Sequence, residues 1–298
     1  MLRKAIQRLI QRPKLYSVEN MDTAEVTLGA LCDPPPDADL PPLDRIDPGK
    51  DIVINDETLF WRENGYLKVP NLIPHDLLDA YVVDCQERDI APHGWNEPNP
   101  YTHEPLMRDI ACHRPLMDKL EMLIGTPMGL NLALTGWRST TRTWHQDDYL
   151  NPPYINCHYA AVWIALDDVH PDAGPFQFVP CSHRWPLMRG DRVQALLPEE
   201  TRFDPDWPTQ AEQIITDLFD AEINASGIPV ETFCPKKGDA LIWHARLAHR
   251  GSLPKDKSLE RRSLIAHYSA IALRTDLPRL KRHGNQGWYF LLNESEER

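Results

Sequence analysis

The sequence predicts a mostly β fold with flanking helices, an antiparallel jelly roll in which two sheets pack face to face. From Leu130 onward the chain consists of short strand-like runs interrupted by Gly and Pro. Runs of this kind are typical of two-sheet jelly rolls. The length of 298 residues and the hydrophobic content of 42% are sufficient for a substantial core.

The N-terminal fifty residues predict two segments that precede a single domain over residues 51–298. Residues 1–14 hold five basic residues and no acid, with apolar residues at helical spacing. This pattern indicates a short basic amphipathic helix, which can contact an anionic membrane surface. The alternative is a helix docked on its own domain or on a second subunit. Residues 33–48 contain six prolines and repeated Asp, and predict an extended arm.

Three stretches predict helices within the main domain: residues 76–88, 116–124 and 211–223. The last lies in an insertion, residues 190–236, that interrupts the strand-rich part. Eight acids fall between Glu199 and Glu222, with Arg202 as the single base. We expect this insertion to act as a lid, with a solvated acidic helix as the alternative.

The most informative feature is the tripeptide His145-Gln146-Asp147, together with His249 at a distance of 249 − 147 = 102 residues. Residues i and i+2 of a strand point to one face, and the Thr and Trp residues around the tripeptide favour a strand. Two imidazoles and a carboxylate form the ligand set of non-haem Fe(II) sites, which leave positions open for a co-substrate and O₂. The alternative is a surface histidine beside an acid.

Arg261 and Ser263 predict a carboxylate-binding pair downstream of His249. They lie two residues apart, and the arginine fork can grip a carboxylate such as the distal one of 2-oxoglutarate. The alternative for Arg261 is a surface salt bridge. However, residues 262–273 have the composition of a buried strand, so the start of that strand is expected near the core.

Four stretches carry a family resemblance: residues 60–70 (FWRENGYLKVP), 144–148 (WHQDD), 160–184, and 249–261. Because these four stretches follow one another in this order, the chain resembles the phytanoyl-CoA dioxygenase family of Fe(II)/2-oxoglutarate oxygenases, which includes ectoine hydroxylase. The resemblance extends over about residues 58–270. It implies a double-stranded β-helix, the cupin-like form of the jelly roll, with helices supporting one sheet.

The resemblance also implies roles for particular residues. His145, Asp147 and His249 would bind Fe(II), and Arg261 with Ser263 would hold 2-oxoglutarate. Trp163 would line the co-substrate pocket, with core packing as the alternative. Asn131 and Thr135, on alternate positions of the preceding strand, are expected to face the same cavity. Others are candidates for contact with substrate, with packing again the alternative: Gln146, Trp144, Tyr149, Trp137 and Trp243.

Two departures from the family pattern stand out. The Gly of its Pro-Gly-Ser-His turn is Cys181 here, so the turn needs another way to tolerate its backbone angles. The usual His-Gly-Ser carries an extra residue, Arg250, which shifts the family's arginine by one place. Arg261 is the expected counterpart because it forms Arg-x-Ser with Ser263, and Arg262 is the alternative. His244 is expected on the opposite face of a strand from the metal.

The predicted function is hydroxylation of an unactivated C–H bond of a small-molecule metabolite, with release of succinate and CO₂. Fe(II), 2-oxoglutarate and O₂ are the cofactor and co-substrates required. The presence of Asp147 favours hydroxylation, because related halogenases place a small residue there. The alternatives are a non-catalytic binding protein of the same fold, or an oxygenase that desaturates or cyclises its substrate.

Charge and cysteine usage restrict the partners and the compartment. A formal net charge of −12 argues against nucleic acid, and the acidic insertion weighs mildly against a highly anionic substrate. The six cysteines form no Cys-x-x-Cys, as expected in a reducing compartment. Because no membrane-spanning stretch or signal peptide is evident, we expect a cytoplasmic protein. Residues 1–14 offer contact with the inner membrane face.

Overall fold

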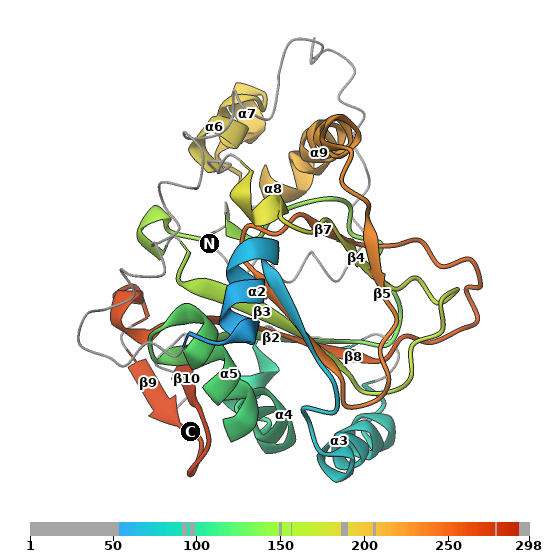
Figure 1. The fold of residues 1–298 in the computed structure, drawn as a ribbon, viewed down its shortest axis with the longest axis vertical. Coiled ribbons are helices and arrows are strands. Elements are labelled where there is room, and N and C mark those ends of the chain that lie inside the picture. The colour runs from blue at the N-terminus through green and yellow to red at the C-terminus, as the bar shows by residue number, and fades with distance from the viewer. Residues whose placement is uncertain are drawn as a thin grey trace.

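The computed structural model describes residues 54–90, 94–95, 99–148, 151–155, 157–185, 190–204, 207–277 and 279–291. Two sheets face each other at its centre, and helices surround them (Figure 1). The predicted N-terminal helix and arm, and Tyr149, lie outside the described residues. Among the described residues, no helix is both long and apolar enough to cross a bilayer.

The larger sheet has seven strands in the order β1-β6-β3-β8-β2-β10-β9. β10 pairs with β2 in parallel, and the other neighbours are antiparallel. The bounds are β1 Tyr66–Val69, β2 Met128–Gly136, β3 Tyr159–Ala165, β6 Ala240–His244, β8 Ser263–Ala270, β9 Arg279–Arg282 and β10 Trp288–Leu291.

The smaller sheet has the order β5-β4-β7, with both pairings antiparallel. Its strands are short: β4 Phe176–Phe178, β5 Glu231–Phe233 and β7 His249–Gly251. Two facing sheets with helices beside the larger one are the architecture that the sequence predicts.

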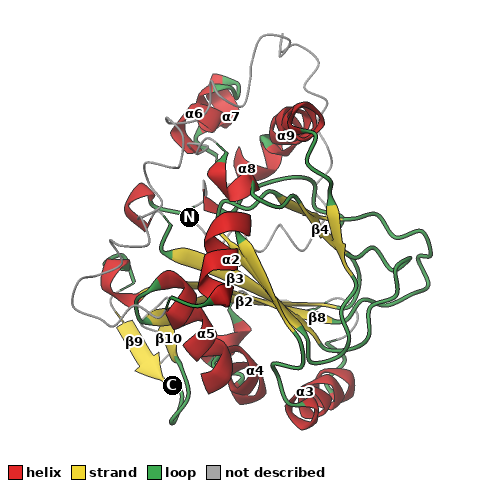
Figure 2. Cartoon of the chain, in the orientation of Figure 1, coloured by secondary structure: helices red, strands yellow, loops and turns green. Residues whose placement is uncertain are grey.

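Four helices cover one face of the larger sheet (Figure 2). They are α2 Asp56–Asn64, α3 His75–Glu87, α4 Pro105–Ala111 and α5 Arg114–Ile124. The helices predicted over 76–88 and 116–124 are confirmed as α3 and α5. α5 ends at Gly125, whose φ of 82° is a left-handed conformation that glycine adopts without steric cost.

Alternate residues of the central strands divide the core into two layers, as the two-residue period of a strand requires. Val162 and Ile242 pack toward the helices. Trp163 and Trp243 pack toward the smaller sheet, where they meet Phe176 and other aromatic residues. Both faces of β3 and β6 are buried, which explains why these strands read as continuous apolar runs.

The insertion forms four helices that lie together at one end of the molecule (Figure 1). They are α6 Gly190–Ala195, α7 Glu199–Arg202, α8 Trp207–Gln210 and α9 Glu212–Ser226. The helix predicted over 211–223 is confirmed as α9. The apolar side of the insertion, which includes Val193, Ile215 and Phe219, forms a hydrophobic cluster together with residues outside the insertion.

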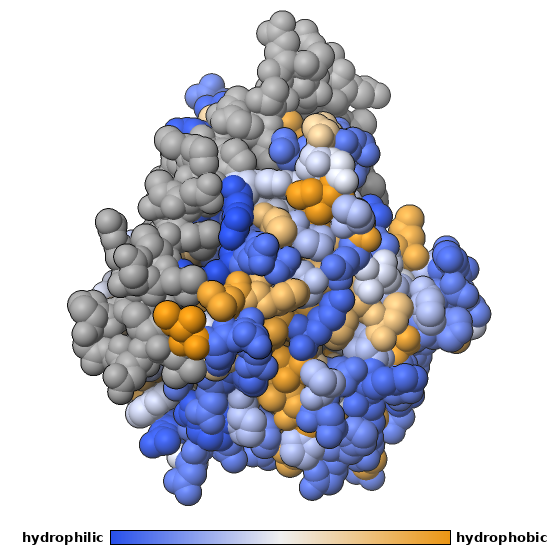
Figure 3. Space-filling view, in the orientation of Figure 1, coloured by the Kyte–Doolittle hydropathy of each residue, from blue (hydrophilic) through white to orange (hydrophobic). Residues whose placement is uncertain are grey.

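The surface on the side drawn in Figure 1 is mainly hydrophilic, with hydrophobic residues interspersed over its middle (Figure 3). Single exposed apolar residues are normal on folded proteins. The large hydrophobic side chains exposed among the described residues are Ile54, Leu59, Phe60, Val83, Tyr154, Phe203 and Leu253.

Candidate metal centre

The two ligand-bearing segments meet at the edge of the smaller sheet. The backbone N–H of His145 donates to the carbonyl of His249 (3.1 Å), and the N–H of His249 donates back (3.0 Å). The next anchor is the Asp147 N–H, which donates to the carbonyl of Ala245 (2.7 Å). The predicted strand is therefore a single β-bridge between His145 and His249 rather than a strand.

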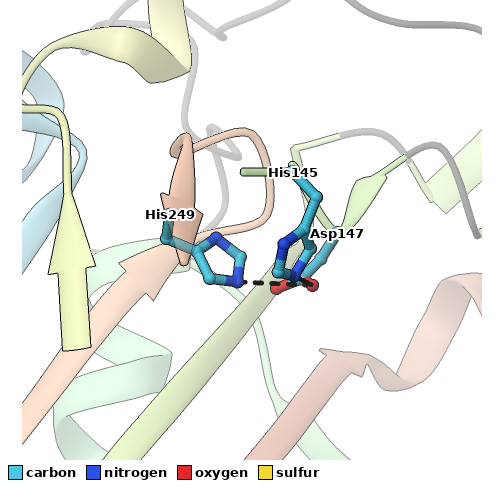
Figure 4. A group of neighbouring side chains, drawn as sticks. All are labelled: His145, Asp147 and His249. Atoms are coloured by element: carbon cyan, nitrogen blue, oxygen red, sulfur yellow. Dashed lines mark ion pairs between the residues drawn. The ribbon is translucent and has the colours of Figure 1, made fainter. Parts of the chain in front are cut away.

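His145, Asp147 and His249 form a compact, buried cluster. One ligand atom from each lies within 4.8 Å of the others. The Nε2 atoms of both histidines are 3.7 Å from Oδ1 of Asp147, and the two rings converge on that carboxylate (Figure 4). Among the described residues, this is the one group of His, Cys, Asp and Glu whose geometry could hold a metal ion.

Backbone carbonyls set the orientation of both imidazoles. Nδ1 of His145 donates to the carbonyl of Thr143 (2.7 Å), and Nδ1 of His249 donates to that of Leu247 (2.9 Å). Each neutral ring therefore presents the lone pair of Nε2 toward Asp147. Phe176 stacks against the His249 ring with an interplanar angle of 22°, which restricts its rotation.

The electrostatics keep the three groups in their metal-binding protonation states. Burial lowers the pKa of both His145 and His249, so the rings are neutral near pH 7. Burial acts to raise the pKa of Asp147, but His249, His267, Arg142 and a hydrogen bond from Trp243 outweigh it and lower that pKa. A neutral imidazole and an ionised carboxylate are the forms that bind a metal without releasing protons.

Arg261 is a buried cation on the inner side of the sheet. Its Nη1 donates to the carbonyl of Gly174 (2.8 Å), and its guanidinium carbon lies 5.8 Å from the centre of the Trp163 ring. Its Nε has no hydrogen-bond partner, and no carboxylate of the described residues pairs with it. Burial lowers its pKa to about 10. A buried guanidinium without an anion is costly, so this position suits the carboxylate of a ligand.

Arg262 behaves differently from its neighbour. It is half-buried and lies outside the inner face, where it pairs with Glu260 (2.7 Å) and Asp167 (3.5 Å). Its guanidinium also lies over the Trp137 ring, 4.5 Å from its centre. Trp137 is thus occupied by packing, and Arg262 already has the anions that Arg261 lacks.

The predicted co-substrate residues divide into two groups. Ser263 and Trp163 lie on the inner face with Arg261, and the Ser263 hydroxyl donates to the carbonyl of Gly136 (3.3 Å). Thr135 does not share their side, because its hydroxyl bonds the Tyr81 hydroxyl of α3 (2.6 Å). A shift in the β2–β8 register between Leu130 and Leu132 places Asn131 and Thr135 on different faces. The expectation of one shared cavity is therefore wrong.

Four of the five candidates for substrate contact are described, and two of them, Gln146 and Trp144, are engaged in contacts within the protein. Gln146 donates from Nε2 to the carbonyl of Arg246 (2.6 Å). The Trp144 ring lies in the apolar cluster of the insertion, under the Arg250 guanidinium (4.5 Å). Trp243 supports the metal site directly, since its Nε1 donates to Oδ2 of Asp147 (3.0 Å).

Three residues near the metal site escaped the sequence analysis. His267 lies 4.0 Å from Oδ2 of Asp147, and its Nδ1 is hydrogen-bonded to the Tyr159 hydroxyl (2.9 Å). Alternation along β8 from Ser263 could have placed His267 on the inner face, whereas no local signal points to Tyr159. Arg142 contributes positive charge that acts on Asp147.

A family model, phytanoyl-CoA dioxygenase (PhyH), matches residues 61–253, which is more than half of the chain. The chain belongs to the phytanoyl-CoA dioxygenase family. No curated protein matches it. The predictions of family and of a cupin-like jelly roll are thereby confirmed.

Solved structures show the same fold. The chain is similar to EctD from S. alaskensis with 2-oxoglutarate and 5-hydroxyectoine, at 16% identity and a TM-score of 0.55, covering 76% of this chain and 79% of that one. The epimerase SnoN in complex with Fe3+, alpha ketoglutarate and nogalamycin RO has 20% identity and a TM-score of 0.52, with 72% and 82% covered. The carbocyclase SnoK from nogalamycin biosynthesis has 20% identity and a TM-score of 0.52, with 73% and 84% covered.

Proposed function

We propose that this protein is an Fe(II)/2-oxoglutarate-dependent oxygenase that acts on a small molecule. The observation that carries the proposal is the joint presence of a buried His-Asp-His cluster and a buried arginine without an anion. Membership of the family, and the fold shared with EctD and SnoN, support the same assignment. A protein without a metal or an anionic ligand would have no use for this combination.

In this proposal His145, Asp147 and His249 are the protein ligands of Fe(II). The two Nε2 atoms and the Asp147 carboxylate would hold the ion, and a ligand set of this kind would leave positions free for a co-substrate and O₂. Trp243 fixes the Asp147 carboxylate by its hydrogen bond, and the backbone carbonyls fix both imidazoles. The chemistry supplied by bound Fe(II) and 2-oxoglutarate is the oxidation of a C–H bond by O₂, with decarboxylation of 2-oxoglutarate to succinate.

Arg261 is the proposed anchor of 2-oxoglutarate. Its fork would hold the distal carboxylate, Ser263 could add a hydroxyl contact, and Trp163 would form the wall beside it. Burial strengthens this recognition, because a charge-assisted hydrogen bond is worth more where water is excluded.

Among reaction outcomes we propose hydroxylation, since Asp147 occupies the carboxylate position of the ligand set. An epimerase and a carbocyclase share the fold, so stereochemical inversion or ring closure is the second candidate. Product mass separates the outcomes. Hydroxylation adds one oxygen atom, epimerisation leaves the mass unchanged, and ring closure or desaturation removes two hydrogens.

A paired substitution tests the proposal. In anaerobic binding titrations with Fe(II) present, Arg261→Ala should weaken 2-oxoglutarate binding by about 100-fold, because truncating one partner of a buried charge pair costs about 2–5 kcal/mol. Arg262→Ala removes the same charge one residue away and should change it by less than about twofold. Equal effects of the two variants, or no binding of 2-oxoglutarate to the wild type, would contradict the proposal.

A further inference from the structure

One carboxylate of the acidic insertion, that of Glu212 at the start of α9, contacts the segment that carries His145. Oε1 of Glu212 accepts hydrogen bonds from the hydroxyl of Thr143 (2.9 Å) and from its backbone N–H (3.3 Å). Thr143 and Glu212 are separated by 69 residues in sequence. The contact therefore connects the insertion to the segment that carries His145.

Thr143 is also the residue that orients His145. Its carbonyl accepts the hydrogen bond from Nδ1 of His145 at 2.7 Å, which directs Nε2 toward Asp147. Glu212 thus holds the N–H and the hydroxyl of the same residue whose carbonyl holds the ligand. Partners beyond the first ligands commonly fix the tautomer and direction of a metal-bound imidazole.

Apolar packing joins the same two regions. The cluster of the insertion includes Ile214, Leu218 and Phe219 of α9, and also Trp144 and Ala248 from the core. Trp144 directly precedes His145, and Ala248 directly precedes His249. The insertion is consequently packed against the residue that precedes each of the two histidines, which connects the position of α9 to both ligand-bearing segments.

We propose that the insertion stabilises the metal centre, and that Glu212 acts through Thr143 as a positioning residue for His145. Metal occupancy and the packing of α9 then stabilise each other, because coupling between two sites is reciprocal. This inference rests on the proposed Fe(II) site. The competing explanation is that Glu212 serves α9 alone, since acids are favoured in the first turn of any helix.

Fe(II) affinity, measured anaerobically by competition with a chromophoric chelator, distinguishes the two explanations. Glu212→Ala and Thr143→Val should each weaken Fe(II) binding by about tenfold, the lower end of the effect of removing an outer partner of a ligand. Thr143→Ser and Glu212→Gln keep the hydroxyl and an acceptor oxygen, and should restore most of the affinity. Glu222→Ala removes the same charge from α9 and is the matched control.

Hydrogen exchange provides a readout that does not depend on catalysis. In the wild type, Fe(II) with 2-oxoglutarate should slow the exchange of backbone amides across α9, and in Glu212→Ala this protection should be lost. Folding of each variant is checked by its thermal transition without metal. A helix-only role of Glu212 would lower that transition and leave both Fe(II) affinity and metal-induced protection unchanged.

The outcomes separate the failure of this inference from that of the proposed function. If the wild type binds no Fe(II), the proposed function is wrong and the inference falls with it. If the wild type binds Fe(II) but Glu212→Ala matches Glu222→Ala in affinity, the inference alone is wrong. It is also wrong if Fe(II) leaves the exchange of α9 unchanged in the wild type.

Discussion

Two buried pairs of histidines lie on opposite sides of the larger sheet, and only one of them is built to hold a metal. The rings of His145 and His249 lie 4.1 Å apart, and both Nε2 atoms point to the Asp147 carboxylate. The rings of His183 and His244 lie 5.4 Å apart. There, Nε2 of His183 bonds the carbonyl of Arg62 (3.0 Å).

The hydrogen bonds and the pKa of His244 distinguish the second pair from the first. Its Nδ1 accepts the N–H of Arg246 (3.1 Å), and its Nε2 has no hydrogen-bond partner in the described structure. Burial, followed by the nearby His183 and Arg246, lowers its pKa well below the usual value. Burial is common to both pairs. The difference is the Asp147 carboxylate, whose Oδ1 lies 3.7 Å from Nε2 of both rings of the first pair, and this carboxylate completes a metal site.

The largest expected effect comes from removing the carboxylate. Asp147→Ala should weaken Fe(II) binding by on the order of 100-fold or more, because loss of a mere outer partner already costs about 10–100-fold. His244→Asn, which keeps an acceptor for the Arg246 N–H, should leave Fe(II) affinity within about twofold. Isothermal titration under argon measures both. Comparable losses in the two variants would mean that the second pair also takes part in binding.

The pH dependence of stability sharpens the comparison next. The pKa of His244 is lowered in the folded state. As pH falls below about 6.5, this histidine therefore becomes protonated in the unfolded chain but stays neutral in the folded protein. The neutral His244 ring therefore costs no free energy of unfolding above that pH. Below it, the free energy of unfolding falls by about 1.4 kcal/mol for each pH unit. His244→Asn should reduce the acid slope of the unfolding free energy by that amount. Urea titrations between about pH 6.5 and 5 would show an unaltered slope if the folded ring were charged.

A smaller effect is expected at the indole that fixes the metal carboxylate. Trp243→Phe keeps the ring packing but removes the hydrogen bond to Oδ2 of Asp147. We expect Fe(II) affinity to fall by about tenfold, while the thermal transition without metal moves little. Unchanged affinity in a chelator competition assay would show that Asp147 is held by packing alone.

The smallest effect concerns the turn that carries His183. Cys181 has φ 64°, in the left-handed region, and directly precedes the short helix Ser182–Arg184. Because a non-glycine residue costs about 1–2 kcal/mol there, Cys181→Gly should stabilise the protein by about 1 kcal/mol in urea unfolding. Fe(II) affinity should be unaffected. Destabilisation would indicate that the contacts of the Cys181 side chain contribute more to the free energy of unfolding than its left-handed backbone conformation costs.

Much of this comparison was accessible from the sequence. Short strand-like runs broken by Gly and Pro predicted the strand-rich part of the chain, and helical periodicity predicted α3, α5 and α9. The spacing of His145 and Asp147 predicted ligands on one side. The opposite placement of His244 was also expected, but the reason differs. The expectation came from counting five residues from His244 to His249 along one strand, but His244 ends β6 and His249 begins β7. His244 points away from the metal because it alternates with Trp243 on β6, and Trp243 faces the metal site.

The remainder depends on contacts that no local pattern encodes. The register shift in β2 reverses the side to which Asn131 points relative to Thr135, and a one-residue slip moves every side chain to the other face. The bond between Glu212 and Thr143 joins residues 69 positions apart. Such pairs become neighbours only when the whole fold forms, which is why the attachment of the insertion to the metal centre was not foreseen.

The most direct test of the central claim is the visible spectrum of the protein after anaerobic addition of Fe(II) and 2-oxoglutarate. The account predicts a weak charge-transfer band in the wild type and in His244→Asn, and its absence in His145→Ala. A wild-type protein that retains Fe(II) yet develops no such band would contradict the assignment of this cluster as an Fe(II)/2-oxoglutarate centre.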